Sequence, residues 1–253
     1  MKYPKAFLCC LSPVIILSAS ASAAIISINF DTGNVTSSTL GGAPGVRVNN
    51  WNVWAANTDL EEGGPVVDEA GTPVPGLTAT VGVGGRSQRG NPSGLSNDSL
   101  IFTSVIDVQS STTVSVSGVP YAQYDVYAYM HDDGSDRAGS FTIGGTTYYV
   151  RGTGSGNPAP DGTGYVLSTD TDVDLSNPNT VTVDESIAQG HYVVFRGVSG
   201  ASFDLLAGAV DTSNGANRNK FSGFQIVQVP EPSSLALFLL SGGGFLLQRR
   251  RQG

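Results

Sequence analysis

The chain has 253 residues, with 13 lysines and arginines against 21 aspartates and glutamates, and its formal net charge is −8. The acidity is concentrated in residues 24–228, where 8 basic and 20 acidic residues give a net charge of −12. A polyanionic surface repels the phosphates of nucleic acids and anionic lipid headgroups, which argues against nucleic-acid binding. The same acidity suits an extracellular protein kept soluble by self-repulsion, or one that binds divalent cations.

Residues 1–23 have the three-part pattern of a secretory signal peptide. Two lysines precede an apolar run, residues 6–17, and small residues follow it. The sequence predicts cleavage between Ala23 and Ala24, with Ala21 and Ala23 as the small residues of the cleavage site. The expected partner of this segment is the Sec translocon.

Both cysteines, Cys9 and Cys10, lie within the predicted signal peptide. A lipoprotein signal would place its cysteine after the apolar run, whereas these two lie near its start. After cleavage no cysteine remains, so the sequence predicts no disulfide, no thiol nucleophile and no thiolate metal site.

Residues 24–228 show a hydrophobic period of two, which is typical of strands with one buried face. In QYDVYAYMH, residues 123–131, Tyr124 and Val126 point to one side while Asp125 and Tyr127 point to the other. The segment FTIGGTTYYV predicts a hairpin, because two consecutive glycines supply the positive φ of a tight turn. The expected strands, in chain order, are residues 24–30, 46–54, 100–108, 112–118, 123–131, 141–143, 146–150, 179–184, 191–198, 202–208 and 221–227.

The segments between these strands are rich in Gly, Asn, Asp and Pro, and no amphipathic helix of ten or more residues is evident. Many short strands joined by such turns predict an all-β domain, a β-sandwich or jelly roll, over residues 24–228. No fixed-period repeat is present, which argues against a solenoid.

A sugar-binding surface needs aromatic rings that stack on pyranose faces and polar groups that hydrogen-bond the hydroxyls. Trp51 and Trp54 differ by three positions, so on a regular strand they face opposite ways and at most one is a platform. Core packing is the alternative for either tryptophan, and a second packed sheet would equally bury the two tyrosines of the candidate set. The candidate glycan-binding residues are Trp51, Trp54, Tyr127, Tyr129, Asp132 and Arg218.

Clustered carboxylates suit hard ions such as Ca²⁺, and Asp132, Asp133 and Asp136 lie together in MHDDGSDRAG. The alternative is an ordinary Asp-Gly-Ser turn. A second acidic run, residues 170–174, has acids at the first three ligand positions of an EF-hand, but Leu175 replaces the necessary glycine. The EF-hand is therefore rejected, while weak surface binding of a cation stays open for this run, and no cofactor other than Ca²⁺ is expected.

Signatures of catalysis are few. His131 and His191 are the two histidines, and His191 begins an apolar strand, where a structural role is expected. The glycine-rich GVGGRSQRG lacks the G-K-[ST] ending of a phosphate-binding loop, and no serine lies in a G-x-S-x-G frame. Among 20 acids, a pair at the glycosidase separation of about 5–10 Å can arise by chance. The prediction is a non-catalytic domain, with a secreted carbohydrate-active enzyme as the alternative.

The chain ends in VPEPSSLALFLLSGGGFLLQRRRQG, residues 229–253. Here Pro-Glu-Pro precedes an apolar stretch, residues 235–247, and three arginines follow. A helix over residues 233–248 would span about 24 Å, which is marginal for a hydrocarbon core of about 30 Å. Arginines at this place stay cytoplasmic, so the domain is left on the far side of the membrane, as the signal peptide also demands.

These three features, in this order at the chain end, resemble the PEP-CTERM sorting signal, a segment also known as the ice-binding protein C-terminal domain. The resemblance implies processing by an exosortase, a membrane cysteine protease-transpeptidase. The protein would then pass to the cell surface or exopolysaccharide matrix of a Gram-negative-type bacterium. A plain tail anchor is the alternative. The motif positions are Val229, Pro230, Glu231, Pro232, Arg249, Arg250 and Arg251.

The succession of YDVYAYM, FTIGGTTYY, GHYVVFRGVSGASFDLLAG and RNKFSGFQIV resembles secreted β-sandwich domains related to galactose-binding and carbohydrate-binding modules. This resemblance implies that the last strand lies near the first. The expected function is a structural or adhesive one within extracellular polysaccharide, with glycan binding as the candidate activity. Ice binding is a second alternative, but it requires a flat, regular array of threonines, and TTVSVSG and GGTTYY are isolated from each other in the sequence.

Overall fold

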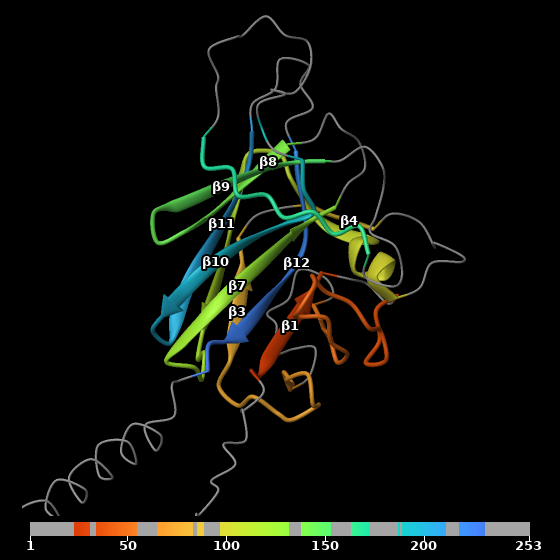
Figure 1. Cartoon of the computed structure of the whole chain (residues 1–253), viewed down its shortest axis with the longest axis vertical. Helices are drawn as coiled ribbons and strands as arrows, with labels where there is room; N and C mark the ends of the chain where they lie inside the picture. The colour runs from red at the N-terminus through yellow and green to blue at the C-terminus, as the bar shows by residue number, and fades with distance from the viewer. Residues whose placement is uncertain are drawn as a thin grey trace, which may run out of the picture.

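The computed structural model describes residues 23–30, 34–54, 65–82, 85–88, 97–131, 138–152, 163–172, 187, 189–210 and 218–230. Within them the chain forms two β-sheets packed face to face (Figure 1). This confirms the expected all-β sandwich. The predicted signal peptide up to residue 22, the acidic cluster 132–136 and the tail from residue 231 lie outside the described residues.

The first sheet has seven strands built around β12 (Asn219–Gln228). One edge of β12 pairs with β7 (Gln123–Met130), which pairs in turn with β10 (Tyr192–Ser199). The other edge is shared between two strands, β1 (Ile25–Asn29) and β5 (Ser104–Val108). The two remaining short strands lie beyond these: β2 (Asn52–Val53) pairs with β1, and β4 (Gly85–Gln88) pairs with β5.

The second sheet has five antiparallel strands in the order β3-β6-β11-β8-β9. Its central strand, β11 (Ser202–Ala209), pairs with β6 (Ser111–Ser117) and β8 (Ala138–Ile143). The edge strands are β3 (Thr78–Val81) and β9 (Thr146–Arg151). β8 and β9 form the predicted hairpin around Gly144 and Gly145, whose φ angles are 55° and 85°.

The main core lies between the two sheets and follows the period-two pattern. In β6, for example, Val114 and Val116 are buried while Ser115 and Ser117 are exposed. Aromatic rings fill the centre of this core, and Phe221 contacts both Phe30 and Phe141 edge-on at centroid distances of 4.8 and 5.1 Å. Burial of these apolar faces is the main source of stability for such a sandwich.

Two of the expected strands are formed only in part. Residues 46–54 make just the two-residue β2, because Asn50 takes a left-handed φ of 58° that breaks the extended chain. Residues 100–108 begin as a 3₁₀ helix, η2 (Asn97–Phe102), and only then continue as β5. Both departures place residues over the outer face of the first sheet.

The two ends of the described chain lie side by side. β1 and β12 pair antiparallel, as the expected contact of first and last strands requires. The Gln228 N–H donates to the Ala24 carbonyl at 2.9 Å, and the Val229 N–H donates to the Gln123 carbonyl at 3.0 Å. Both ends therefore leave from the lower end of the sandwich in Figure 1. Within the described ranges no helix has both the length and the apolar character needed to cross a bilayer.

Candidate binding groove

The four aromatic residues considered as glycan platforms are packed inside the protein. Trp54 is 1% exposed and belongs to the core between the sheets, while Trp51 is 4% exposed and belongs to a second cluster on the other side of the first sheet. The two tryptophans thus lie on opposite sides of the first sheet, as their spacing predicts, but both are packed in hydrophobic clusters and neither is a glycan platform. Tyr127 and Tyr129, at 8% and 0% exposure, also belong to the second cluster, so their rings are not free platforms either.

Tyr127 and Tyr129 are covered by a loop and not by a second sheet. Residues 34–51, with η2 and Tyr165, form a cover over the outer face of β7, β10 and β12. A hydrogen-bond network below the cover fixes it, because Tyr129 Oη donates to Gln225 Oε1 and accepts the Ala43 N–H at 3.0 Å. Burial of this hydroxyl raises the pKa of Tyr129 well above its usual value.

A buried ion pair closes the cover. Asp98 of η2 is fully buried, and its Oδ2 lies 2.6 Å from Nη2 of Arg47. Its Oδ1 accepts the Gly42 N–H at 3.0 Å and the Tyr165 hydroxyl at 3.1 Å. The sequence analysis did not single out these residues, because they are far apart in the chain and only the fold brings them together.

The other predicted polar residues have structural partners where they are described. Arg218 Nη1 lies 2.8 Å from Oδ2 of Asp107, which also binds Lys220 Nζ at 3.1 Å. His191 is 3% exposed and its Nδ1 accepts the Val166 N–H at 3.1 Å, in agreement with the structural role expected for it. Among the described residues no three His, Cys, Asp or Glu side chains are grouped closely enough to hold a metal ion. The candidate calcium residues Asp132, Asp133 and Asp136 lie outside this part of the chain.

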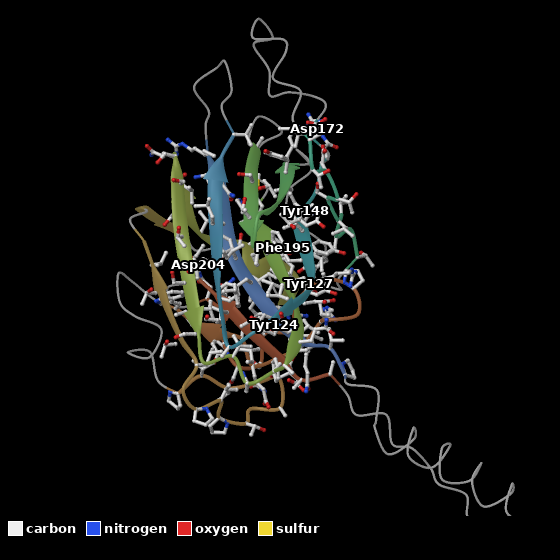
Figure 2. All side chains as sticks on the ribbon, turned by 90° about the vertical axis from the view of Figure 1, so that its left-hand side faces the viewer. Tyr124, Tyr127, Tyr148, Asp172, Phe195 and Asp204 are labelled. Carbon is white, nitrogen blue, oxygen red and sulfur yellow. The ribbon has the colours of Figure 1, made fainter. Side chains whose placement is uncertain are left out.

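A groove opens at the edge of the sandwich where β9 of one sheet faces β10 of the other. We name it the seam groove; its volume is about 480 Å³. Figure 2 looks onto this edge: Tyr148 and Phe195 lie between the sheets, Tyr127 on the outer side of the first sheet and Asp204 on the outer side of the second. Its apolar lining is Ile143, Tyr148, Leu167, Val194, Phe195 and Val198, and its polar lining is Thr146, Ser168, Thr169, Arg196 and Ser199.

The floor of the groove contains one partly accessible aromatic ring, Tyr148, which packs on the buried Phe195. Tyr148 of β9 contacts Phe195 of β10 edge-on at a centroid distance of 5.2 Å. Farther along the same edge, residues 167–170 join the two sheets, since Leu167 forms a bridge to Tyr192 of β10 and Asp170 forms one to Tyr149 of β9. This segment closes one part of the seam and leaves the part beside Tyr148 open.

A β-bulge shapes the polar rim. The register of β10 on β7 shifts between Phe195 and Val198, and Gly197 takes a φ of 66° there. Asp125 holds the bulge by accepting the Gly197 N–H at 2.8 Å and by pairing with Arg196 Nη1 at 2.9 Å. Arg196 is the charged residue among the described residues that line the groove, and its side chain is 67% exposed. It can donate hydrogen bonds to a ligand without leaving water.

The outer face of the second sheet carries mainly hydroxyl groups. Thr113 lies opposite Leu206, Leu206 opposite Thr142, and Thr142 opposite Thr147. The segments TTVSVSG and GGTTYY, which the sequence analysis treated as isolated, therefore share one face. Its hydroxyl residues are Thr78, Thr80, Thr113, Thr142, Thr147, Ser111, Ser115, Ser117, Ser140 and Ser202.

No family model matches the chain, and no curated protein matches it. Among solved structures it is similar to a chain in the crystal structure of the plant peptide RALF23 in complex with FER and LLG2, at 12% identity and a TM-score of 0.32. The match covers 82% of this chain but only 40% of that one, so the chain spans less than half the length of this neighbour. A likeness of this degree carries no argument about function.

Proposed function

We propose that this protein is an exported, non-catalytic β-sandwich that is sorted through a PEP-CTERM-type tail and binds sugar units of extracellular polysaccharide in the seam groove. The seam groove is the observation that carries the binding proposal. Its volume of about 480 Å³ lies within the usual range for small-ligand sites. It combines the partly accessible ring of Tyr148 with hydroxyl and guanidinium donors along the rim, which is the chemistry that a pyranose ring requires.

The lining of the groove favours binding over hydrolysis. A glycosidase needs two carboxyl groups across the scissile bond. No carboxylate is present among the described lining residues, and Asp125 at the rim already pairs with Arg196. A secreted carbohydrate-active enzyme remains the alternative and predicts release of shorter sugars from the bound polysaccharide.

The position of the chain ends supports sorting through the tail. Ala24, where the predicted signal cleavage leaves the mature chain, is hydrogen-bonded to Gln228, which immediately precedes the VPEP motif. Both predicted membrane segments therefore adjoin the same end of the domain. After the domain has folded on the far side of the membrane, the tail can hold it at the end where its mature N-terminus also lies.

Glycan binding is tested with purified residues 24–228 on a glycan array, with and without Ca²⁺. We expect saturable binding that Tyr148→Ala and Arg196→Ala each reduce at least tenfold. Tyr149→Ala is the matched control, because it removes the same side chain from the adjacent position of β9, which points to the opposite face of the sheet. Absence of binding to every glycan, or equal losses at Tyr148 and Tyr149, would contradict a sugar site in the seam groove.

Sorting is tested by replacing Pro230, Glu231 and Pro232 with alanine in a host that carries an exosortase. The intact motif should give a processed form at the cell surface or in the matrix, and the replaced motif should leave the full-length form in the membrane fraction. Identical processing of both forms would refute the motif's role.

Ice binding is a second candidate, favoured by the hydroxyl face of the second sheet. Two features oppose it: Asp204 and Leu206 interrupt the hydroxyl pattern, and strands in a sheet rotate by roughly 20–25° from one to the next, so a flat lattice match is lost across the face. Thermal hysteresis of the purified domain that Thr113→Val and Thr142→Val abolish would establish this function in place of the first.

A further inference from the structure

One end of the sandwich differs from the rest of this acidic domain because five of the segments that meet there carry no charged side chain. We name it the uncharged end and define it by five segments without Asp, Glu, Lys or Arg: residues 23–28, 73–79, 117–124, 199–203 and 227–230. The domain as a whole has 8 basic and 20 acidic residues. A surface of this kind is therefore a local exception within a strongly negative molecule.

Contacts between these segments show that they form one continuous surface. A Cβ placed on Gly118 would meet the Gly76 carbonyl at 1.8 Å, so residues 73–79 and 117–124 touch. The Val119 N–H donates to the Ala201 carbonyl at 3.0 Å, and Tyr124 Oη donates to the Gly200 carbonyl at 3.1 Å. The bonds between Gln123 and Val229 and between Ala24 and Gln228 add the two chain ends to the same surface.

Most exposed residues on this end are small or apolar, and Gln123 is the larger polar one. Pro73, Pro75, Pro120, Ala122 and Ala201 are all exposed. A pocket of about 390 Å³ beside them is lined by Pro, Val, Gly and Leu alone among the described residues. Tyr121 is partly buried here, and tyrosine is a side chain that membrane interfaces favour.

We infer that the uncharged end is the surface that the domain places against lipid headgroups while the tail is in the membrane. This inference rests on the proposed function of the tail. Val229 is still hydrogen-bonded to β7, and the expected membrane helix begins at Ser233. The residues between them span at most about 14 Å at the reach of a fully extended chain, so the domain has no linker that would hold it away from the bilayer.

The charge distribution fits this orientation. A domain with an excess of carboxylates is repelled by anionic lipids, and the repulsion is reduced when the segments without carboxylates face them. Asp68 and Glu69 lie at the rim near Tyr121, and Glu69 Oε2 accepts the Ile25 N–H at 2.6 Å. The amino group that cleavage before Ala24 creates would add one positive charge beside Gln228 at this end.

The test uses the full chain in phosphatidylcholine vesicles, with and without phosphatidylglycerol. Cysteine is absent outside the predicted signal peptide, so in a Cys9→Ser, Cys10→Ser background a single fluorophore can be attached at Ala122→Cys or at Asp172→Cys. Figure 2 places Asp172 at the end of the sandwich opposite to Tyr124. We expect nitroxide-headgroup lipids to quench the label at position 122 several-fold more than the label at position 172.

A charge variant adds a second readout. Ala201→Glu places a carboxylate on the exposed turn of the uncharged end and should reduce quenching at position 122 in vesicles that contain phosphatidylglycerol. Leu206→Glu, on the open face of the second sheet, is the control and should leave the quenching unchanged. Equal quenching at positions 122 and 172 in protein that floats with the vesicles would overturn this orientation alone. Failure of the protein to float with vesicles would overturn the membrane tail, and this inference with it.

Discussion

The buried ion pair between Asp98 and Arg47 should be a principal support of the cover over the first sheet. Asp98→Ala removes the partner of a guanidinium and the acceptor of the Tyr165 hydroxyl, and it leaves the Gly42 N–H with only a long bond of 3.4 Å to Tyr165 Oη. Removal of one partner from a buried pair costs about 3–5 kcal/mol. The Arg47 side chain is 26% exposed and can turn to water, so we expect the lower value, about 3 kcal/mol. For a domain of this size that corresponds to a fall in Tm of about 6–12 °C.

Urea unfolding of the wild type, Asp98→Ala and Asp98→Asn measures this loss. Asp98→Asn retains an oxygen acceptor and should cost less than Asp98→Ala. Loosening of the cover should also expose Trp51, so in a Trp54→Phe background acrylamide should quench the remaining tryptophan more strongly in the alanine variant. A loss below about 1 kcal/mol with unchanged quenching would refute this reasoning. The cover would then depend on its apolar contacts alone.

Two further predictions concern the backbone and alkaline pH. Gly118→Ala should prevent stable folding, because the added Cβ would lie 1.8 Å from the Gly76 carbonyl oxygen. Gly144 has a φ of 55° and no atom lies within 4 Å of a Cβ added to it. Gly144→Ala should therefore lower the free energy of unfolding in urea by only about 1–2 kcal/mol. Burial raises the pKa of Tyr129 and Tyr165 well above the usual value. Burial, together with the negative charges of Glu69 and Asp68, raises the pKa of Tyr121 to about 12. The stability that these tyrosines contribute is fully present below their unfolded pKa of about 10 and is lost as pH rises through their folded pKa values. Circular dichroism should therefore show unfolding at a pH above about 10, together with the rise in absorbance as the buried tyrosines ionise. Titration of all tyrosines near pH 10 with the fold intact would contradict this.

The sequence predicted correctly those strands in which apolar and polar residues alternate because one face contacts the core. In β6, β7 and β11 one face contacts the core, and period two follows directly. The same rule cannot say what lies on the other face. In β7 both faces are buried, because the cover lies over Tyr127 and Tyr129, and no local pattern in the chain reports a cover supplied by residues 34–51.

The seam groove was missed for a related reason. Tyr148 and Phe195 meet at its floor although they are 47 positions apart in the chain. Each lies in a segment whose sequence predicts an ordinary strand with a core-facing side. Only the strand order, which makes β9 and β10 the edges of their sheets on the same side of the sandwich, turns two core residues into the wall of an opening. A single sequence fixes alternation along a strand, but strand order depends on contacts between distant segments.

The cover and the seam groove together determine which aromatic side chains a ligand can reach. An aromatic face left open on the first sheet would be a large apolar patch, which a secreted protein avoids unless the patch is a binding surface. The chain covers that face with its own loop, while the seam, whose rim is polar, stays open. The β10 side of the seam ends at Ser199, which pairs with Gln123, the residue that holds Val229. The groove therefore opens on the side of the domain close to its uncharged end, where the guanidinium and hydroxyl groups of its rim remain accessible to a ligand.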